Sequence, residues 1–215
     1  MPNRDLTNMR TSYEKGFLLE KDCDKNPIFQ FEKWFQQAID DNLYEPNAMQ
    51  IATVGNDLHP SLRTVLLKSF DENGFVFYTN YESKKGVDIK ENDKVALLFW
   101  FREHERQVRI EGIATQTTEE MNEIYFRSRP RDSQIAAYLS NQSIVIENRN
   151  SLDELFLQII QEFKDLEIPI KKNWGGYNIK PTVIEFWQGR QNRLHDRLQY
   201  TLKDNQTWIL ERLAP

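Results

Sequence analysis

Two hydrophobic patterns alternate along this chain, and each predicts a different kind of element. Between residues 28 and 42, apolar side chains recur at i, i+3, i+4, i+7 and i+8; they are Phe31, Trp34, Phe35, Ala38 and Ile39. This spacing places them on one face of an α-helix. The sequence therefore predicts a helix over 28–42 with its aromatic face in the core.

From residue 48 to residue 115 the chain carries short runs of β-branched and aromatic residues, which favour strands. Asn73-Gly74 lies between the second and third runs and favours a hairpin turn. Residues 83–92, between the third and fourth runs, predict a short helix. The runs are AMQIATV (48–54), LRTVLLKSF (62–70), GFVFYTN (74–80), KVALLFWF (94–101) and RQVRIEGIAT (106–115).

Capping signals predict further helices after the fifth run. Thr117 and Glu120 form a capping box at a helix start, and Pro130 is expected to stop that helix. Asp132 or Ser133 is then expected to cap a new helix that runs to about residue 139.

The last third of the chain predicts one long helix followed by strands. Ser151 and Glu154 form a second capping box for a helix over 151–166. Asp204-Asn205 is expected to turn the last pair of strands. The strand-like runs are GGYNI (175–179), TVIEFW (182–187), RLQYTL (197–202) and TWILERL (207–213).

Many short strands joined by tight connections, with helices between groups of them, indicate an α+β fold with a mostly antiparallel sheet or barrel. The chain contains neither GxGxxG nor GxxxxGK[ST], and it has only 8 glycines among 215 residues. A phosphorylated ligand would therefore be held by side chains rather than by a glycine-rich loop. We expect a flexible N-terminal arm over residues 1–20 and a single domain over 21–215.

Composition narrows the classes of function. The net charge of -5, from 28 Lys+Arg against 33 Asp+Glu, argues against a nucleic-acid-binding protein but leaves room for a local anion site. A single cysteine, Cys23, and three scattered histidines predict neither a disulfide framework nor a metal site. No stretch approaches the roughly 18 apolar residues of a membrane span, so we expect a soluble cytoplasmic protein without a membrane partner.

Three polar clusters are candidates for chemistry. In the first, Arg63 and Lys68 interrupt a strand. Strict alternation puts them on opposite faces, so both reach one ligand only through a bulge or at the end of the strand. The alternative is that they are two surface cations on an edge strand.

In the second cluster, Tyr125 and Arg129 share one helical face, and Ser133 opens the next helix. A phenol, a guanidinium, a hydroxyl and a helix N-terminus make a plausible phosphate cup. The alternative is an arginine-rich corner between helices, with Asp132 as an ordinary cap.

In the third cluster, Arg193, His195 and Arg197 would point to one side of an extended segment, which favours an anion beside them. Asp196 would point away, so no catalytic His-Asp pair is implied. The alternative is a solvated charged loop before a strand.

The motifs SRPRDSQI (128–135), EFWQG (185–189) and RLHDR (193–197), in this order, resemble those of the pyridoxamine 5'-phosphate oxidase family. The resemblance extends from about Met9 to Pro215 and includes RTVLLK (63–68), Tyr78-Thr79, ERQV (105–108), Gln142-Ser143 and the C-terminal RLAP. It implies a homodimeric split β-barrel with FMN at the subunit interface. It also implies oxidation of pyridoxamine or pyridoxine 5'-phosphate to pyridoxal 5'-phosphate, with O2 as acceptor and H2O2 as product.

The resemblance also implies roles for individual residues. Those matching flavin contacts are Arg63, Thr64, Val65, Leu66, Leu67, Lys68, Tyr78, Thr79, Lys84, Lys85, Gln107, Gln142, Ser143, Trp187 and Arg197. Those matching the substrate site are Arg10 and Tyr13 in an N-terminal lid, Lys68, Tyr125, Arg129 and Ser133 in a phosphate cup, and Arg193, Leu194 and His195 over the pyridine ring. Lys84 stands where an arginine is common in the family, so the charge is kept but the bidentate fork is lost.

Chemical reasoning assigns the catalytic work to three of these residues. Arg193 and His195 are expected to orient the substrate and assist proton movement, and Arg197 to stabilise the negative charge of the reduced flavin. Two alternatives stay open. One is another split-barrel flavin oxidoreductase, and the other is a non-enzymatic protein that binds FMN or pyridoxal phosphate.

Overall fold

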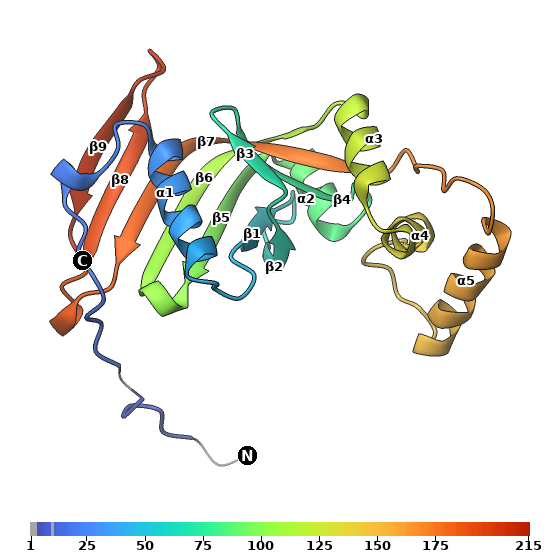
Figure 1. Cartoon of the computed structure of the whole chain (residues 1–215), viewed down its shortest axis with the longest axis horizontal. Helices are drawn as coiled ribbons and strands as arrows, with labels where there is room; N and C mark the ends of the chain where they lie inside the picture. Colours follow the sequence, from blue (N-terminus) through green and yellow to red (C-terminus); the bar gives the residue numbers. More distant parts are fainter. Residues whose placement is uncertain (1–3, 10) are drawn as a thin grey trace. The chain divides into compact units, whose positions relative to one another are not determined.

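The computed structural model describes residues 4–9 and 11–215 of the chain (Figure 1). Arg10, a predicted lid residue, lies outside the described residues. The α-helices are α1 (Pro27–Asp40), α2 (Lys84–Glu91), α3 (Glu119–Ser128), α4 (Arg131–Leu139) and α5 (Arg149–Glu162). Short 3-10 turns are η1 (Glu20–Asp22), η2 (Arg102–His104) and η3 (Gln191–Arg193). The strands are β1 (Ala48–Val54), β2 (Pro60–Leu66), β3 (Ser69–Asp71), β4 (Gly74–Asn80), β5 (Lys94–Phe101), β6 (Arg106–Gln116), β7 (Trp174–Gln188), β8 (Asp196–Leu202) and β9 (Trp208–Leu213).

The contacts divide the chain into two compact units. The terminal unit consists of Met1–Met49, Leu97–Glu111 and Thr182–Pro215, and the central unit of Gln50–Ala96 and Gly112–Pro181. Strands β1, β5, β6 and β7 contribute residues to both units. The expectation of a single domain after residue 20 stays a prediction.

In the central unit the strand order is β2-β1-β5-β6-β7-β4-β3. Strand β4 is antiparallel to both β3 and β7, and Asp71 pairs with Gly74, which confirms the predicted hairpin. Gly74 has φ +142°, and a Cβ there would lie 2.3 Å from the carbonyl oxygen of Ile179, so only glycine fits. Helices α3, α4 and α5 share a core of Phe126, Ile135, Ile159, Phe163, Ile168 and Trp174.

In the terminal unit α1 buries three residues of the predicted stripe, whereas Phe35 is half-buried and Ile39 is exposed. Phe31 and Ala38 are fully buried, and Trp34 packs edge-on against Phe186 of β7 with ring centroids 5.1 Å apart. Asn26 caps this helix by accepting a hydrogen bond from the Ile28 N–H at 2.9 Å. Strands β7, β8 and β9 are consecutive antiparallel neighbours. The predicted α+β fold with a mostly antiparallel sheet is confirmed.

Three predicted strand runs differ from the structure. The run over 62–70 is two strands: β2 ends at Leu66, and the Lys68 N–H donates to Val76 of β4 at 2.8 Å. The chain therefore changes its partner strand from β1 to β4 within this run. The runs over 175–179 and 182–187 are instead one strand, β7, which continues through Pro181.

Two predicted helix caps are replaced by neighbouring side chains, and a third helix has no side-chain cap. Thr118, not Thr117, caps α3 by accepting from the Met121 N–H, and Asn148, not Ser151, caps α5. Helix α4 begins after Pro130 without a side-chain cap, so Asp132 and Ser133 lie inside its first turn. None of the helices in the described chain is long and apolar enough to cross a lipid bilayer.

Candidate functional site

The central unit contains a cavity of about 620 Å³, a size typical of ligand sites. Its lining includes four cationic side chains, Arg63, Lys68, Lys85 and Arg129, and none of the described residues that line it is an Asp or Glu. The other lining residues are Thr64, Val65, Leu66, Tyr78, Thr79, Asn80, Tyr125, Pro130, Ser133, Ala136, Ala137, Ser140, Gln142 and Trp174. Because nothing in this lining neutralises the cations, the cavity is suited to anions.

The end of β2 explains how Arg63 and Lys68 reach one cavity although they lie an odd number of residues apart. Arg63 projects from β2, whereas Lys68 follows the end of β2 and already pairs with β4 through its backbone. The strict alternation of a strand does not apply across this change of partner. Of the two routes that the sequence left open, a bulge or the end of the strand, the structure shows the end of the strand.

One end of the cavity is built around the buried ammonium group of Lys85, in the first turn of α2. Its Nζ donates to Gln142 Oε1 at 2.9 Å, to Thr79 Oγ1 at 3.1 Å and to Ser83 Oγ at 3.3 Å. Burial, followed by the nearby charge of Arg63, lowers the pKa of Lys85 to about 8. We call Arg63, Thr79, Lys85 and Gln142 the Lys85 cluster. Two cations that raise each other's energy make this cluster a strong site for an anion.

A second group in the lining is aromatic and contains Arg129. The rings of Tyr78 and Tyr125 stack with centroids 3.9 Å apart, and Tyr125 stacks with Trp174 at 6.1 Å. The Arg129 guanidinium lies 5.1 Å from the centroid of the Trp174 ring, and its buried Nη1 has no hydrogen-bond partner in the described structure. Burial lowers the pKa of Arg129. We call Tyr78, Tyr125, Arg129 and Trp174 the Arg129 cluster, and its unpaired donor indicates that a ligand completes it.

Ser133 lines the cavity, but not in the way that the sequence predicts. It lies in the first turn of α4, and its N–H already donates to the carbonyl of Pro130 at 2.9 Å. The N–H of Ser133 itself is therefore not free to bind an anion, and the anion site at this helix N-terminus stays a prediction. The Ser133 side chain remains a candidate contact because it belongs to the lining.

Three predicted flavin contacts of the central unit lie outside the cavity lining. Lys84 Nζ is 2.6 Å from Asp88 Oδ1 and 3.6 Å from Asp57 Oδ2. Leu67 is buried, and Ser143 is exposed with φ 73°. Their roles toward a flavin stay predictions.

The sequence reasoning missed part of the lining. Ala136, Ala137 and Ser140 were missed; they lie three, four and seven residues after the predicted Ser133, on one helix face, and all are small. A stripe of small residues beside an arginine-rich corner was the available signal. Trp174 was also missed, although its ring forms a wall of the Arg129 cluster.

The terminal unit holds the residues of the RLHDR motif. The His195 ring lies 4.6 Å from the Trp187 ring and 5.9 Å from the ring of Tyr13, centroid to centroid. His195 Nδ1 accepts from the Arg190 N–H at 3.1 Å, so the neutral ring carries its proton on Nε2. Burial and the charge of Arg193 lower the pKa of His195. This histidine is therefore neutral near pH 7.

The sequence predicts an extended segment for this motif, but the structure shows a turn at its start. Asn192 and Arg193 have φ of 56° and 61°, and residues 191–193 form the η3 turn. Arg193 and His195 line one hollow together with Tyr13, whereas Arg197 does not belong to that lining. Leu194 lines the adjacent hollow and is largely exposed. The expectation of Arg193, His195 and Arg197 on one side of a strand was therefore wrong.

Arg197 is instead held by a carboxylate. Its Nε and Nη2 donate to the two oxygens of Glu185 at 2.8 and 3.1 Å, and its Nη1 donates to the carbonyl of Ala214 at 2.9 Å. The hydrogen bonds to Glu185 raise the pKa of Arg197. Gln107 lies on β6 of the same unit and is half-buried.

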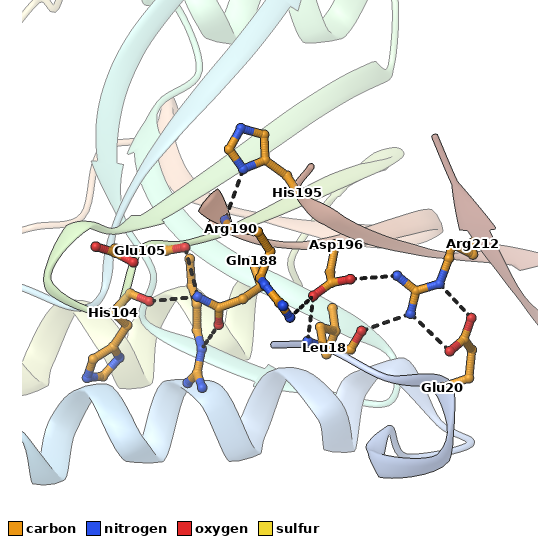
Figure 2. A network of polar contacts seen from close by, with 10 residues as sticks. Leu18, Glu20, His104, Glu105, Gln188, Arg190, His195, Asp196 and Arg212 are labelled. Carbon is orange, nitrogen blue, oxygen red and sulfur yellow. Dashed lines mark hydrogen bonds and ion pairs between the residues drawn. The ribbon is translucent and has the colours of Figure 1, made fainter. Parts of the chain in front are cut away.

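Asp196 and Glu105 fix the backbone around this motif (Figure 2). Asp196 accepts from Arg190 at 3.1 Å, from Arg212 at 2.8 Å and from the Leu18 N–H at 3.0 Å, as Figure 2 shows. Glu105 accepts from the N–H groups of residues 14 and 15 at 2.7 and 3.0 Å. His195 and Asp196 thus have different partners among these contacts: His195 binds the backbone of residue 190, and Asp196 binds the side chain of Arg190.

The structure thus gathers the predicted residues into two groups. The central group surrounds the cavity and includes Arg63, Thr64, Val65, Leu66, Lys68, Tyr78, Thr79, Lys85, Tyr125, Arg129, Ser133 and Gln142. The terminal group consists of Tyr13, Trp187, Arg193 and His195. The described residues contain no group of His, Cys, Asp or Glu that could hold a metal ion.

Comparison with known proteins identifies two family models along the chain. "Pyridoxamine 5'-phosphate oxidase" matches residues 35–159, and "Pyridoxine 5'-phosphate oxidase C-terminal dimerisation region" matches residues 174–215. A pyridoxine/pyridoxamine 5'-phosphate oxidase of Aliarcobacter butzleri is 55% identical over 213 residues, which cover 98% of this chain and 100% of the relative. The protein of the same name from Crocosphaera subtropica is 54% identical over 215 residues, with 98% and 100% coverage.

Solved structures are also similar. PhzG from Burkholderia lata, crystallised with tetrahydrophenazine-1-carboxylic acid, is 27% identical, has a TM-score of 0.88 and covers 95% of this chain and 100% of its own. A pyridoxamine 5'-phosphate oxidase-related, FMN-binding protein of Nostoc punctiforme is 18% identical with a TM-score of 0.68, over 86% of this chain and 97% of its own. The second likeness concerns the fold alone.

Proposed function

The chain belongs to the pyridoxamine 5'-phosphate oxidase family, and we propose that its cationic cavity binds FMN and the phosphate of a vitamin B6 substrate. The protein oxidises pyridoxamine and pyridoxine 5'-phosphates to pyridoxal 5'-phosphate, with O2 as acceptor and H2O2 as product. The observation that carries this proposal is the lining of four cations without a carboxylate in the described structure.

The Lys85 cluster fits the phosphate of FMN. Arg63 and Lys85 repel each other, and a phosphate dianion between such groups would remove that cost. Thr79 and Gln142 keep the Lys85 ammonium in place through hydrogen bonds of 3.1 and 2.9 Å. FMN needs no glycine-rich cradle here because side chains supply the charge.

The Arg129 cluster fits the phosphate of the substrate. The buried Nη1 of Arg129 lacks a partner, and the hydroxyls of Tyr125 and Ser133 and the ammonium of Lys68 belong to the same lining. Separate binding sites for the two phosphates would hold the flavin ring and the pyridine ring at a fixed position relative to each other. This lowers the entropic cost of reaching the transition state.

The chain supplies binding, orientation and proton handling. When bound, FMN supplies the two-electron redox chemistry that these side chains lack. His195, with the proton of its neutral ring on Nε2, is placed to hold a hydrogen bond at one defined atom, and burial, followed by the charge of Arg193, lowers its pKa and so favours the neutral ring. We assign to these two residues the orientation of the pyridine ring and the movement of a proton.

We further propose a homodimer with FMN at its interface and a cytoplasmic location. The C-terminal match to a dimerisation region supports the dimer. The lone, unpaired Cys23 suits a reducing compartment.

The proposal is tested with the purified protein in air. A visible flavin spectrum, H2O2 release on adding pyridoxamine 5'-phosphate and formation of pyridoxal 5'-phosphate are expected together. A flavin spectrum without peroxide would indicate a binding protein. Oxidation of a nicotinamide cofactor without turnover of the B6 substrate would indicate another split-barrel flavin oxidoreductase.

A further inference from the structure

A buried carboxylate lies one side chain away from Arg63, and the function described above does not use it. Asp88 on α2 and Thr53 on β1 are each only 1% exposed. Thr53 Oγ1 donates to Asp88 Oδ2 at 2.8 Å and accepts from Arg63 Nη1 at 2.7 Å. The directions are fixed because a guanidinium only donates and an ionised carboxylate only accepts.

Among the contacts of Arg63 Nη1 in the described structure, the one with the Thr53 hydroxyl is the shortest. The other acceptors of Nη1 are the carbonyls of Ile51 at 3.3 Å and Ser61 at 3.2 Å, and Nη2 bonds to the Ser61 hydroxyl. A hydroxyl that donates to a carboxylate becomes a better acceptor. The hydrogen bond from Thr53 to Asp88 therefore strengthens the hydrogen bond from Arg63 to Thr53. Thr53 is therefore one of the groups that hold the guanidinium, and it connects the guanidinium to a buried carboxylate.

Asp88 is itself satisfied without Arg63. Its Oδ1 is 2.6 Å from Lys84 Nζ, one turn away on the same helix. The carboxylate is thus neutralised by a lysine outside the cavity lining, while the hydroxyl keeps it apart from Arg63. Burial lowers the pKa of Arg63, and the charge of Asp88 opposes that shift. Arg63 is held in place and remains charged, without an ion pair that a ligand would have to break.

We propose that Thr53 and Asp88 are positioning residues for the FMN phosphate: they orient Arg63 toward the anion site through a hydroxyl, so that its charge stays available to the ligand. This inference rests on the proposed function, which assigns the FMN phosphate to the Lys85 cluster. It also gives Lys84 a role different from a direct phosphate contact, namely that of counter-ion to Asp88.

The test compares two ligands that differ only in the phosphate. Apo-protein is titrated with FMN and with riboflavin, and the Kd of each is measured by the quenching of flavin fluorescence. Thr53→Val removes the hydroxyl and keeps the shape, so the Kd for FMN should rise about tenfold, the worth of one hydrogen bond to a charged group, while that for riboflavin stays within about twofold. Thr53→Ser keeps the hydroxyl and should bind both flavins as the parent protein does.

Other outcomes overturn the inference. If Thr53→Val weakens FMN and riboflavin equally, Thr53 has only a structural role, and if neither Kd changes, Arg63 does not depend on it. Thr53→Ala serves where Thr53→Val folds poorly, with the same expected ratio of the two Kd values. Arg63→Gln separates the two proposals. If this variant changes the ratio of the Kd for FMN to the Kd for riboflavin and Thr53→Val does not, only the positioning role is refuted. An unchanged ratio in Arg63→Gln refutes the phosphate site itself.

Discussion

Several arginines of the terminal unit are ion-paired, whereas the cations that line the cavity of the central unit have no acidic residue beside them among the described lining residues. In the terminal unit, Arg197 is bound by Glu185 at 2.8 Å. Figure 2 shows that Arg190 is bound by Asp196 at 3.1 Å, and Arg212 by Glu20 and Asp196 at 2.8 Å each. In the central unit, the cavity lining brings four cations together with no acid among its described residues. Paired arginines hold the fold, whereas unpaired ones stay available to a ligand.

This contrast resolves the apparent conflict between an acidic chain and phosphorylated ligands. The net charge of -5 counts the whole chain and says little about one cavity. The contrast also yields an order of expected effects: removing an unpaired cation should cost binding, and removing a paired one should cost stability as well.

The largest effect is expected for Arg129→Leu. The change removes the half-buried guanidinium that we propose as the contact of the substrate phosphate, so kcat/KM for pyridoxamine 5'-phosphate should fall by about 100-fold or more. Steady-state oxygen consumption measures it. Arg149→Leu is the matched control, because Arg149 is exposed and pairs only with Asp153 one turn away. Equal losses in both variants would remove the distinction between the cavity and the surface.

Arg197→Leu should combine two losses. Glu185 is 4% exposed, and without Arg197 it keeps only the contact of 3.2 Å to Arg109. The free energy of unfolding should drop by about 2 kcal/mol because a buried carboxylate loses charged donors. We expect kcat/KM to fall more than about tenfold as well, since the motif loses its geometry. Near-parental turnover of this variant would contradict a role for Arg197 in the reaction.

Lys85 predicts a dependence of flavin affinity on pH. Its pKa of about 8 means that the free protein loses the ammonium charge as pH rises above that value. Binding of an anion must then take up a proton, so the Kd for FMN should rise about tenfold between pH 7 and 9. In Lys85→Arg the cation persists, and the Kd should stay flat over this range. A flat profile in the parent protein would show that Lys85 does not serve the anion site.

The smallest effect concerns His195. Arg193 lowers the pKa of this ring by repulsion, after the larger contribution of burial. Arg193→Ala should therefore raise the pKa of His195 and move the acid limb of the kcat/KM profile to higher pH. An acid limb that stays in place, or moves to lower pH, would argue against His195 as the titrating group.

Local patterns in the sequence predicted most helices and strands, but not where each strand breaks or continues, nor which residue caps each helix. The stripe from Phe31 to Ile39 predicted α1 because its period is local. The break after Leu66 and the continuity of β7 through Pro181 depend on which strands pair, and no local pattern encodes that. Caps shifted by a few residues because several Ser, Thr and Asn side chains compete at each helix start.

The sequence was sufficient to predict the charged residues of the site. The motif around Arg129 and Ser133 pointed to a phosphate cup, and both residues line the cavity. The link from Thr53 to Asp88 spans 35 residues and joins a strand to a helix, so it becomes visible only in the folded chain. The ion pair of Arg197 with Glu185 likewise arises from the pairing of β7 with β8.

The central claim is that unpaired cations in the cavity select phosphorylated substrates, and one anaerobic titration tests it directly. The FMN-loaded protein is titrated with pyridoxamine 5'-phosphate and, separately, with pyridoxamine, while the visible flavin absorbance is recorded. The account predicts that the phosphate ester bleaches the flavin at concentrations about 100-fold lower or more than the free amine, as expected for a buried charged contact. Bleaching at equal concentrations of the two compounds, or no bleaching by either, would contradict it.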